Sequence, residues 1–187
     1  EAHAQTGRTP AIRFDTRGKR VAFVDAFSGP HSIDVEKQLG DFVIAKSDGS
    51  PAYQLAVVVD DAHAGVTHVV RGDDLIESAA RQIVVYEALG IADQVPAYMH
   101  LPLVVGGDGR RLAKRHGDTR IAHYRSIGVT VDRVLSLLAR WSGVHSTQPL
   151  STSRELVTDF DPSRLPRTPI VMSRKDEQSL RGKLSVE

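Results

Sequence analysis

Residues 66 to 74 read Val66-Thr67-His68-Val69-Val70-Arg71-Gly72-Asp73-Asp74, an apolar, β-branched run that gives way to charged residues. This run predicts a buried strand over Val66–Val70. A helix is expected next, from about Ile76 to Leu89, with Gly90 at its end. The apolar residues from Tyr98 to Val105 predict a second strand. A strand, a helix and a strand in this order form a βαβ unit, so the sequence predicts an α/β fold with a parallel sheet.

A turn and a basic loop follow the second strand. Residues 106 to 109 read Gly-Gly-Asp-Gly, and from Arg110 to Arg125 six basic residues stand against one acid, Asp118. Such a loop attracts polyphosphate, and a helix that begins at Asp118, with this side chain as its cap, would add N-terminal amides to the same anion site. Residue types alone favour an ordinary solvated basic hairpin.

Arg71 and the basic loop both follow predicted strands. Ligands of open parallel sheets bind at the carboxyl ends of the strands, so we expect the two to converge on one cleft. A guanidinium group offers a planar fork for a small carboxylate, and Tyr53 could add a hydroxyl donor to the same ligand. The alternatives are an ion pair of Arg71 with Asp73 or Asp74 and a tyrosine packed in a strand.

The flanking segments predict further elements. Residues 1 to 40 suggest short, irregular β structure, Phe42–Ala45 a strand, and Tyr53–Val59 a β-rich run. Thr130 is expected to cap a helix that has an apolar face from Val131 to Trp141 and ends at Gly143. Further elements are a helix that opens with a capping box at Thr152 and Glu155, and an extended tail punctuated by Pro162, Pro166 and Pro169.

The composition of the chain limits the kinds of site and surface that it can have. The chain has 187 residues, 41% of them hydrophobic, and a net charge of +1, so any nucleic-acid surface must be local. The sequence holds no cysteine, which excludes disulfides and thiolate metal sites and suits a reducing, cytoplasmic compartment. No apolar run is long enough for a membrane span, and no signal peptide is recognisable. Glu1 is not methionine, so we expect upstream sequence.

The segment from Asp41 to Arg115 resembles a known family. Arg111-Leu112-Ala113-Lys114-Arg115 is similar to the Lys-Met-Ser-Lys-Ser loop of class I aminoacyl-tRNA synthetases, and His100-Leu101-Pro102-Leu103 matches their glutamyl branch. The segments Asp41–Ile44, Ala52–Asp61 and Gly65–Leu75 resemble glutamyl-tRNA synthetases, and most of all their shortened paralogues, the glutamyl-Q tRNA(Asp) synthetases.

This resemblance implies a two-step ligase that uses ATP and Mg²⁺. Glutamate and ATP give glutamyl-adenylate and pyrophosphate, and the glutamyl group then passes to queuosine in the anticodon of tRNA(Asp). By similarity, Tyr53 and Arg71 hold glutamate, and Arg111, Leu112, Ala113, Lys114 and Arg115 bind ATP. Lys114 corresponds to the second lysine of the signature and is the expected catalytic residue. Arg111 keeps the charge of the family's lysine, whereas Ala113 lacks a common serine hydroxyl.

Two departures shape the expected domains. The family's His-Ile-Gly-His motif and its cysteine-bearing zinc site are absent from these 187 residues. We therefore expect the C-terminal portion of a longer synthetase with half of the active site. Its parts would be the rest of an acceptor-arm insertion (1–40), the second half of a Rossmann-type domain (41–115) and a small helical subdomain (116–187).

Two other functions stay open. One is a truncated glutamyl-tRNA synthetase that charges tRNA(Glu), although the segment after Arg115 is too short for its large anticodon-binding domain. The other is a non-catalytic synthetase-like module that binds tRNA or a nucleotide.

Overall fold

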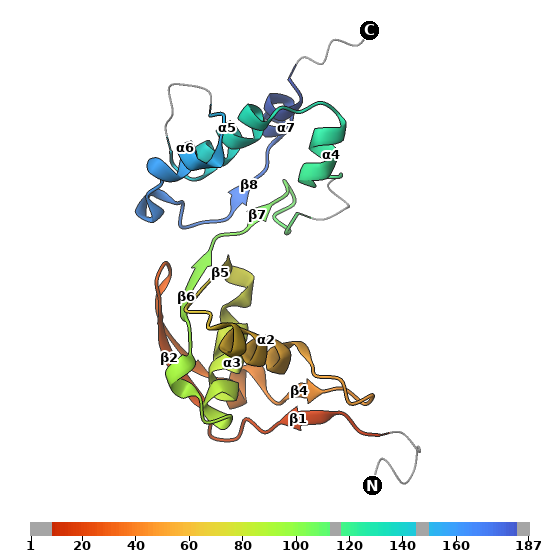
Figure 1. Ribbon diagram of the computed structural model, residues 1–187, viewed down its shortest axis with the longest axis vertical. Coiled ribbons are helices and arrows are strands. Elements are labelled where there is room, and N and C mark those ends of the chain that lie inside the picture. Colours follow the sequence, from red (N-terminus) through yellow and green to blue (C-terminus); the bar gives the residue numbers. More distant parts are fainter. Residues whose placement is uncertain (1–8, 113–116, 145–149, 183–187) are drawn as a thin grey trace. The chain divides into compact units, whose positions relative to one another are not determined.

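A computed structural model describes residues 9–112, 117–144 and 150–182 of the chain. The chain divides into two units, Glu1–Leu101 and Pro102–Glu187, and each is described by itself (Figure 1). Helices and strands occur in both, as the predicted α/β class requires.

Two antiparallel pairs of strands open the first unit. Strand β1 (Ile12–Phe14) pairs with β4 (Phe42–Ala45), and β2 (Arg20–Asp25) forms a hairpin with β3 (Gly29–Asp34). A turn of π-helix, η1 (Val35–Leu39), follows β3. The strand predicted at Phe42–Ala45 and the short β segments before residue 40 are confirmed.

The βαβ unit is confirmed as well. Strand β5 (His68–Gly72) leads through a short 3-10 turn, η2 (Asp73–Leu75), into helix α3 (Ile76–Ala88). A second 3-10 turn, η3 (Ala92–Gln94), precedes β6 (Ala97–Leu101), which pairs parallel with β5. Helix α3 packs its buried face on the hairpin and on β6, with Val84 and Val35 fully inside.

The strand predicted over Tyr53–Val59 is wrong. These residues begin helix α2 (Tyr53–Ala64), which ends at Gly65 in the left-handed conformation. Leu55, Val58 and Ala62 recur at helical spacing and pack with Val85 of α3. This packing outweighs the preference of valine for strands, because each β-branched residue lowers the stability of a helix by only about 0.5 kcal/mol.

The strand predicted over Tyr98–Val105 is interrupted. It divides into β6 and β7 (Val104–Val105), which belong to different two-stranded sheets. Pro102 lies in the break, and proline has no N–H to donate to a ladder of hydrogen bonds.

Helices make up most of the second unit (Figure 1). Strand β7 pairs parallel with β8 (Ile170–Val171). The helical elements are α4 (Ile121–Ser126), α5 (Val131–Trp141), α6 (Ser153–Thr158), the 3-10 turn η5 (Pro162–Arg164) and α7 (Arg174–Arg181). Leu137 of α5 and Leu180 of α7 are buried with Tyr124 of α4 in one apolar cluster.

The helix starts in this unit differ in part from expectation. Asp118 is not a helix cap: its carboxylate accepts from the backbone N of Arg120 at 3.1 Å, and α4 begins three residues later. Thr130 precedes α5 as predicted but makes no side-chain capping bond. The Thr152 hydroxyl accepts from the backbone N of Glu155 at 3.4 Å, which is one half of the predicted capping box. The Glu155 carboxylate accepts from the backbone N of Ser151 at 2.8 Å and not from that of Thr152, so the other half is not formed. The predicted extended tail is wrong from Arg174, where α7 begins with a capping box between Ser173 and Asp176.

Candidate functional site

Arg71 lies on β5 beside His100, its register partner on β6. Its Nε donates to His100 Nε2 at 3.0 Å. Its Nη2 donates to Gln82 Oε1 at 3.0 Å and to the carbonyl oxygen of Leu75 at 3.3 Å. These bonds place the guanidinium group in a polar network between the two parallel strands and α3.

Asp25 holds the other side of His100. The two side chains are fully buried, and His100 Nδ1 lies 2.7 Å from Asp25 Oδ2. Backbone N–H groups of His100, Phe27 and Ser28 also donate to this carboxylate. Burial raises the pKa of Asp25, but the hydrogen bonds from Ser28, His100 and Phe27 outweigh burial and lower it to about 2. Asp25 is therefore a charged, fully satisfied acceptor at the end of β2.

Two glutamines extend the network to α2. Because arginine only donates, Gln82 must present Oε1 to Arg71, and its Nε2 then donates to Gln54 Oε1 at 3.0 Å. Gln54 Nε2 donates in turn to the Ser78 hydroxyl at 3.2 Å. The guanidinium group of Arg71 is thereby linked to the first turn of α2.

The aromatic ring of Tyr98 completes the surroundings of Arg71. The guanidinium carbon lies 5.3 Å from the ring centroid, which is within the range of a cation–π contact. Tyr98 is buried, and burial raises the pKa of its hydroxyl.

One nitrogen of Arg71 remains for a ligand. Within the described residues, Nη1 donates to no protein acceptor, whereas the Nε–Nη2 edge is engaged by His100 and Gln82. An incoming carboxylate can bond Nη1 and replace the long 3.3 Å contact of Nη2 with Leu75. The guanidinium group is thus prepared to receive an anion from one side.

Tyr53 lies close in sequence to this network. It is the first residue of α2, next to Gln54, and the residue is 56% exposed. Tyr53 is therefore an exposed residue of a helix, and the alternative of a tyrosine packed in a strand is wrong. A shared role of Tyr53 and Arg71 in one site stays a prediction.

The predicted nucleotide loop begins in the second unit. Gly106 and Gly109 turn the chain back after β7, and Arg111 forms an antiparallel bridge with Val105. The backbone N of Leu112 donates to the carbonyl of Val104 at 3.3 Å. Ala113, Lys114 and Arg115 lie outside the described residues, so the roles predicted for them stay predictions, as does convergence of the loop with Arg71.

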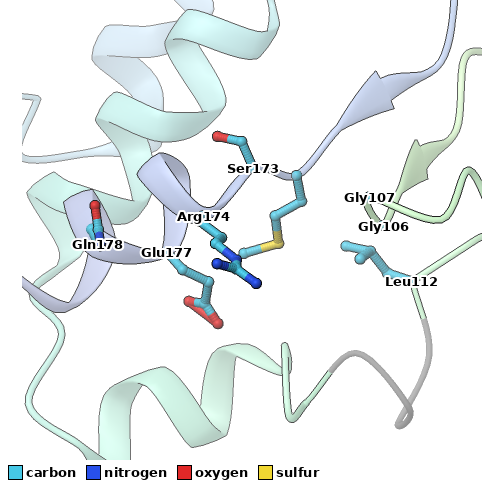
Figure 2. A pocket seen from close by; sticks show the side chains of 8 residues that line it. Gly106, Gly107, Leu112, Ser173, Arg174, Glu177 and Gln178 are labelled. Carbon is cyan, nitrogen blue, oxygen red and sulfur yellow. The ribbon is translucent and has the colours of Figure 1, made fainter.

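A cavity of about 620 Å³ lies beside this hairpin. Gly106, Gly107 and Leu112 line one side, and helix α7 lines the other (Figure 2). Arg174 extends from the start of α7 into the space between the helix and Leu112. Glu177 also lines the cavity, and its carboxylate accepts a hydrogen bond from the Tyr124 hydroxyl at 3.2 Å. Burial, and to a smaller extent the negative charge of Glu177, raises the pKa of Tyr124 to about 12.

Charge is distributed unevenly between the units. Residues 1–101 hold nine basic and 14 acidic residues, whereas residues 102–187 hold 15 basic and nine acidic ones. The second unit is therefore the one suited to a polyanion. No group of three potential metal ligands occurs among the described residues, and no helix in the same ranges is long and apolar enough to cross a membrane.

The sequence did not single out the network around Arg71. Gln54 and His100 occur in the segments quoted for the family resemblance, and Gln82 lies in the predicted helix, but nothing marked them as partners of Arg71. Asp25 is 75 residues away from His100, and no local pattern predicts such a pair. The available signal was a polar residue, His100, at an alternating position of an otherwise apolar strand.

Comparisons with known proteins agree on one family. The model described as "tRNA synthetases class I (E and Q), catalytic domain" matches residues 1–178. The glutamyl-Q tRNA(Asp) synthetase of Symbiobacterium thermophilum is 44% identical over 97% of the chain and 55% of its own length. The glutamate–tRNA ligase of Nitrosomonas eutropha is 38% identical over 87% of the chain and 35% of its own length.

Solved structures lead to the same group. The glutamate-tRNA synthetase of Elizabethkingia anophelis superposes with a TM-score of 0.75 at 25% identity, over 95% of this chain and 39% of that one. The chain thus spans about half the length of the first of these curated relatives, and less of the others.

Proposed function

The chain belongs to the class I tRNA synthetases (E and Q), catalytic-domain family, and we propose that the whole protein activates glutamate with ATP and transfers it to queuosine in the anticodon of tRNA(Asp). The match to a glutamyl-Q tRNA(Asp) synthetase over nearly the whole chain is the observation that carries this proposal.

In the first step a carboxylate oxygen of glutamate attacks the α-phosphorus of ATP, and the bond to the leaving pyrophosphate breaks. Arg71 is proposed to bind a carboxylate of glutamate through Nη1, with Tyr53 as a second donor. Lys114, together with Arg111 and Arg115, is proposed to neutralise charge that develops on the α-phosphate and the pyrophosphate. Mg²⁺ bound with ATP supplies further charge neutralisation.

In the second step the queuosine base attacks the carbonyl carbon of glutamyl-adenylate, and AMP leaves. The surplus of basic residues after Leu101 supports a tRNA contact by the second unit, because phosphate backbones bind lysine and arginine. Arg125 is one exposed member of this group.

The choice of tRNA is tested by charging. The whole protein would be offered radiolabelled glutamate and ATP with tRNA(Asp) that carries queuosine, with tRNA(Asp) that lacks it, and with tRNA(Glu). We expect label only on the tRNA that carries queuosine. Charging of tRNA(Glu), with no dependence on queuosine, would instead support the second candidate, a glutamyl-tRNA synthetase, which the 38% identity to a glutamate–tRNA ligase favours.

A non-catalytic module is distinguished by the first step alone. Glutamate-dependent exchange of pyrophosphate into ATP is expected for the whole wild-type protein. Absence of exchange, with retained binding of tRNA or ATP, would favour the module.

A further inference from the structure

The guanidinium group of Arg71 is held by a residue that no ligand is expected to touch. His100 is buried and accepts the Nε–H of Arg71 at 3.0 Å, and its other ring nitrogen lies 2.7 Å from the buried carboxylate of Asp25. Two hydrogen bonds therefore connect the carboxylate of Asp25, the imidazole of His100 and the guanidinium group of Arg71.

This geometry selects one form of the imidazole. Arginine can only donate, so Nε2 of His100 must be an acceptor and carry no proton. Nδ1 must then carry the proton that it donates to Asp25. The backbone N of His100 donates to the same carboxylate at 3.0 Å, which fixes the residue from two directions.

We propose that His100, oriented by Asp25, is a positioning residue that holds the Nε edge of Arg71 and leaves Nη1 to the carboxylate of the substrate. This proposal rests on the proposed function, because it takes glutamate as the ligand of Arg71. Gln82 fixes Nη2 in the same way, and the ring of Tyr98 lies against the guanidinium face. An arginine held at its edge and its face loses less rotamer freedom when a ligand binds.

The tautomer can be read directly by NMR on the ¹⁵N-labelled whole protein. At neutral pH a long-range proton–nitrogen spectrum of His100 is expected to show the proton on Nδ1 and none on Nε2. A scalar coupling across the N–H···N hydrogen bond is expected between Arg71 Nε and His100 Nε2. A proton on Nε2 of the neutral ring would overturn the proposal.

The consequence for binding is tested by two substitutions in the whole protein. His100→Leu removes the acceptor and is expected to raise the KM for glutamate in pyrophosphate exchange about tenfold, with little change in the KM for ATP. His100→Gln offers an oxygen near the place of Nε2 and is expected to recover most of this loss. The matched control is His68→Leu, on the same strand as Arg71, where the exposed imidazole bonds only to Thr67 among the described contacts.

The outcomes separate this proposal from the one on which it rests. No glutamate-dependent exchange by the wild-type protein rejects the proposed function. Normal exchange, with an unchanged KM for glutamate in a folded His100→Leu variant, rejects the positioning role alone. Equal changes in the KM values for glutamate and ATP, or no recovery in His100→Gln, would show a purely structural residue and also reject it.

Discussion

Arg71 uses the edge and the face of its guanidinium group in two different kinds of contact. Its Nε–Nη2 edge meets His100 and Gln82, its face lies against Tyr98, and Nη1 is left for a ligand. A lysine could not reproduce this arrangement, because an ammonium group has no fork and no planar face. The role proposed for Arg71 therefore requires the guanidinium group itself and not only its charge.

Lys114 provides the residue-scale test of the nucleotide loop. Lys114→Ala is expected to lower the rate of glutamate-dependent pyrophosphate exchange by roughly two to three orders of magnitude, because a donor to developing negative charge is lost. Exchange would be followed with radiolabelled pyrophosphate. Lys175→Ala, which removes an exposed lysine from α7, serves as the matched control and is expected to leave the rate unchanged. Equal rates in wild type and Lys114→Ala would contradict the catalytic role.

At the scale of elements, the sequence predicted the helices and strands whose apolar residues recur with a clear period and whose ends are marked by other residue types. The apolar run before Arg71, the amphipathic α3 and the apolar residues before Pro102 lead directly to a βαβ unit. Helix α2 was missed because its three consecutive valines are typical of a strand, and its helical period appears only when Ala62 is included.

Helix α7 was missed for the opposite reason. Only Asp176 and Leu180 of its eight residues are buried, so it has almost no apolar stripe. The spacing of Ser173 and Asp176 was the available sign of a helix start. The network around Arg71 could not be predicted, because its side chains come from β2, α2, β5, α3 and β6, which only the tertiary fold brings together.

Asp25, at the end of β2, gives a prediction about how the free energy of unfolding depends on pH. The ordinary pKa of an aspartate is 3.8, and that of Asp25 is lowered to about 2. The pKa of Asp25 is lower in the folded protein than in the unfolded one, so the ionised carboxylate stabilises the folded state. This stabilisation is complete above about pH 4 and is lost as the pH falls through about 2. It amounts to about 2 kcal/mol of unfolding free energy.

Urea unfolding of Asp25→Asn at several pH values tests this prediction. We expect the variant to be less stable than wild type at neutral pH, with a difference that shrinks by about 2 kcal/mol between pH 5 and pH 2. Asp93→Asn, at an exposed position, is the control and should show no such convergence. A difference that stays constant with pH would contradict the buried, charged state of Asp25.

The capping box of α7 gives a second prediction for an element. Ser173→Ala removes the hydroxyl that accepts from the backbone N of Asp176 at 3.2 Å, and is expected to cost about 1 kcal/mol of unfolding free energy. Thermal unfolding monitored by circular dichroism would measure the loss. Ser179→Ala, at an exposed position within the same helix, should cost less than half as much, and equal losses would argue against the cap.

On the scale of the whole molecule, two units of opposite charge contain the residues proposed for different parts of the reaction. Residues 1–101 form an acidic unit that holds Arg71, the arginine proposed to bind a carboxylate, and residues 102–187 hold the basic loop. The family match extends over residues 1–178 and so includes both. The resemblance drawn from the segment between Asp41 and Arg115 is confirmed by this match, whereas the convergence of Arg71 and Lys114 stays a prediction.

The most direct measurement is glutamate-dependent pyrophosphate exchange by the whole protein, in wild type and in Arg71→Lys, with Arg81→Lys as the control on the neighbouring helix. We predict exchange that requires glutamate, and a KM for glutamate that Arg71→Lys raises by roughly one to two orders of magnitude while Arg81→Lys leaves it unchanged. Exchange with another amino acid in place of glutamate, or a KM for glutamate that is indifferent to Arg71→Lys, would contradict the account.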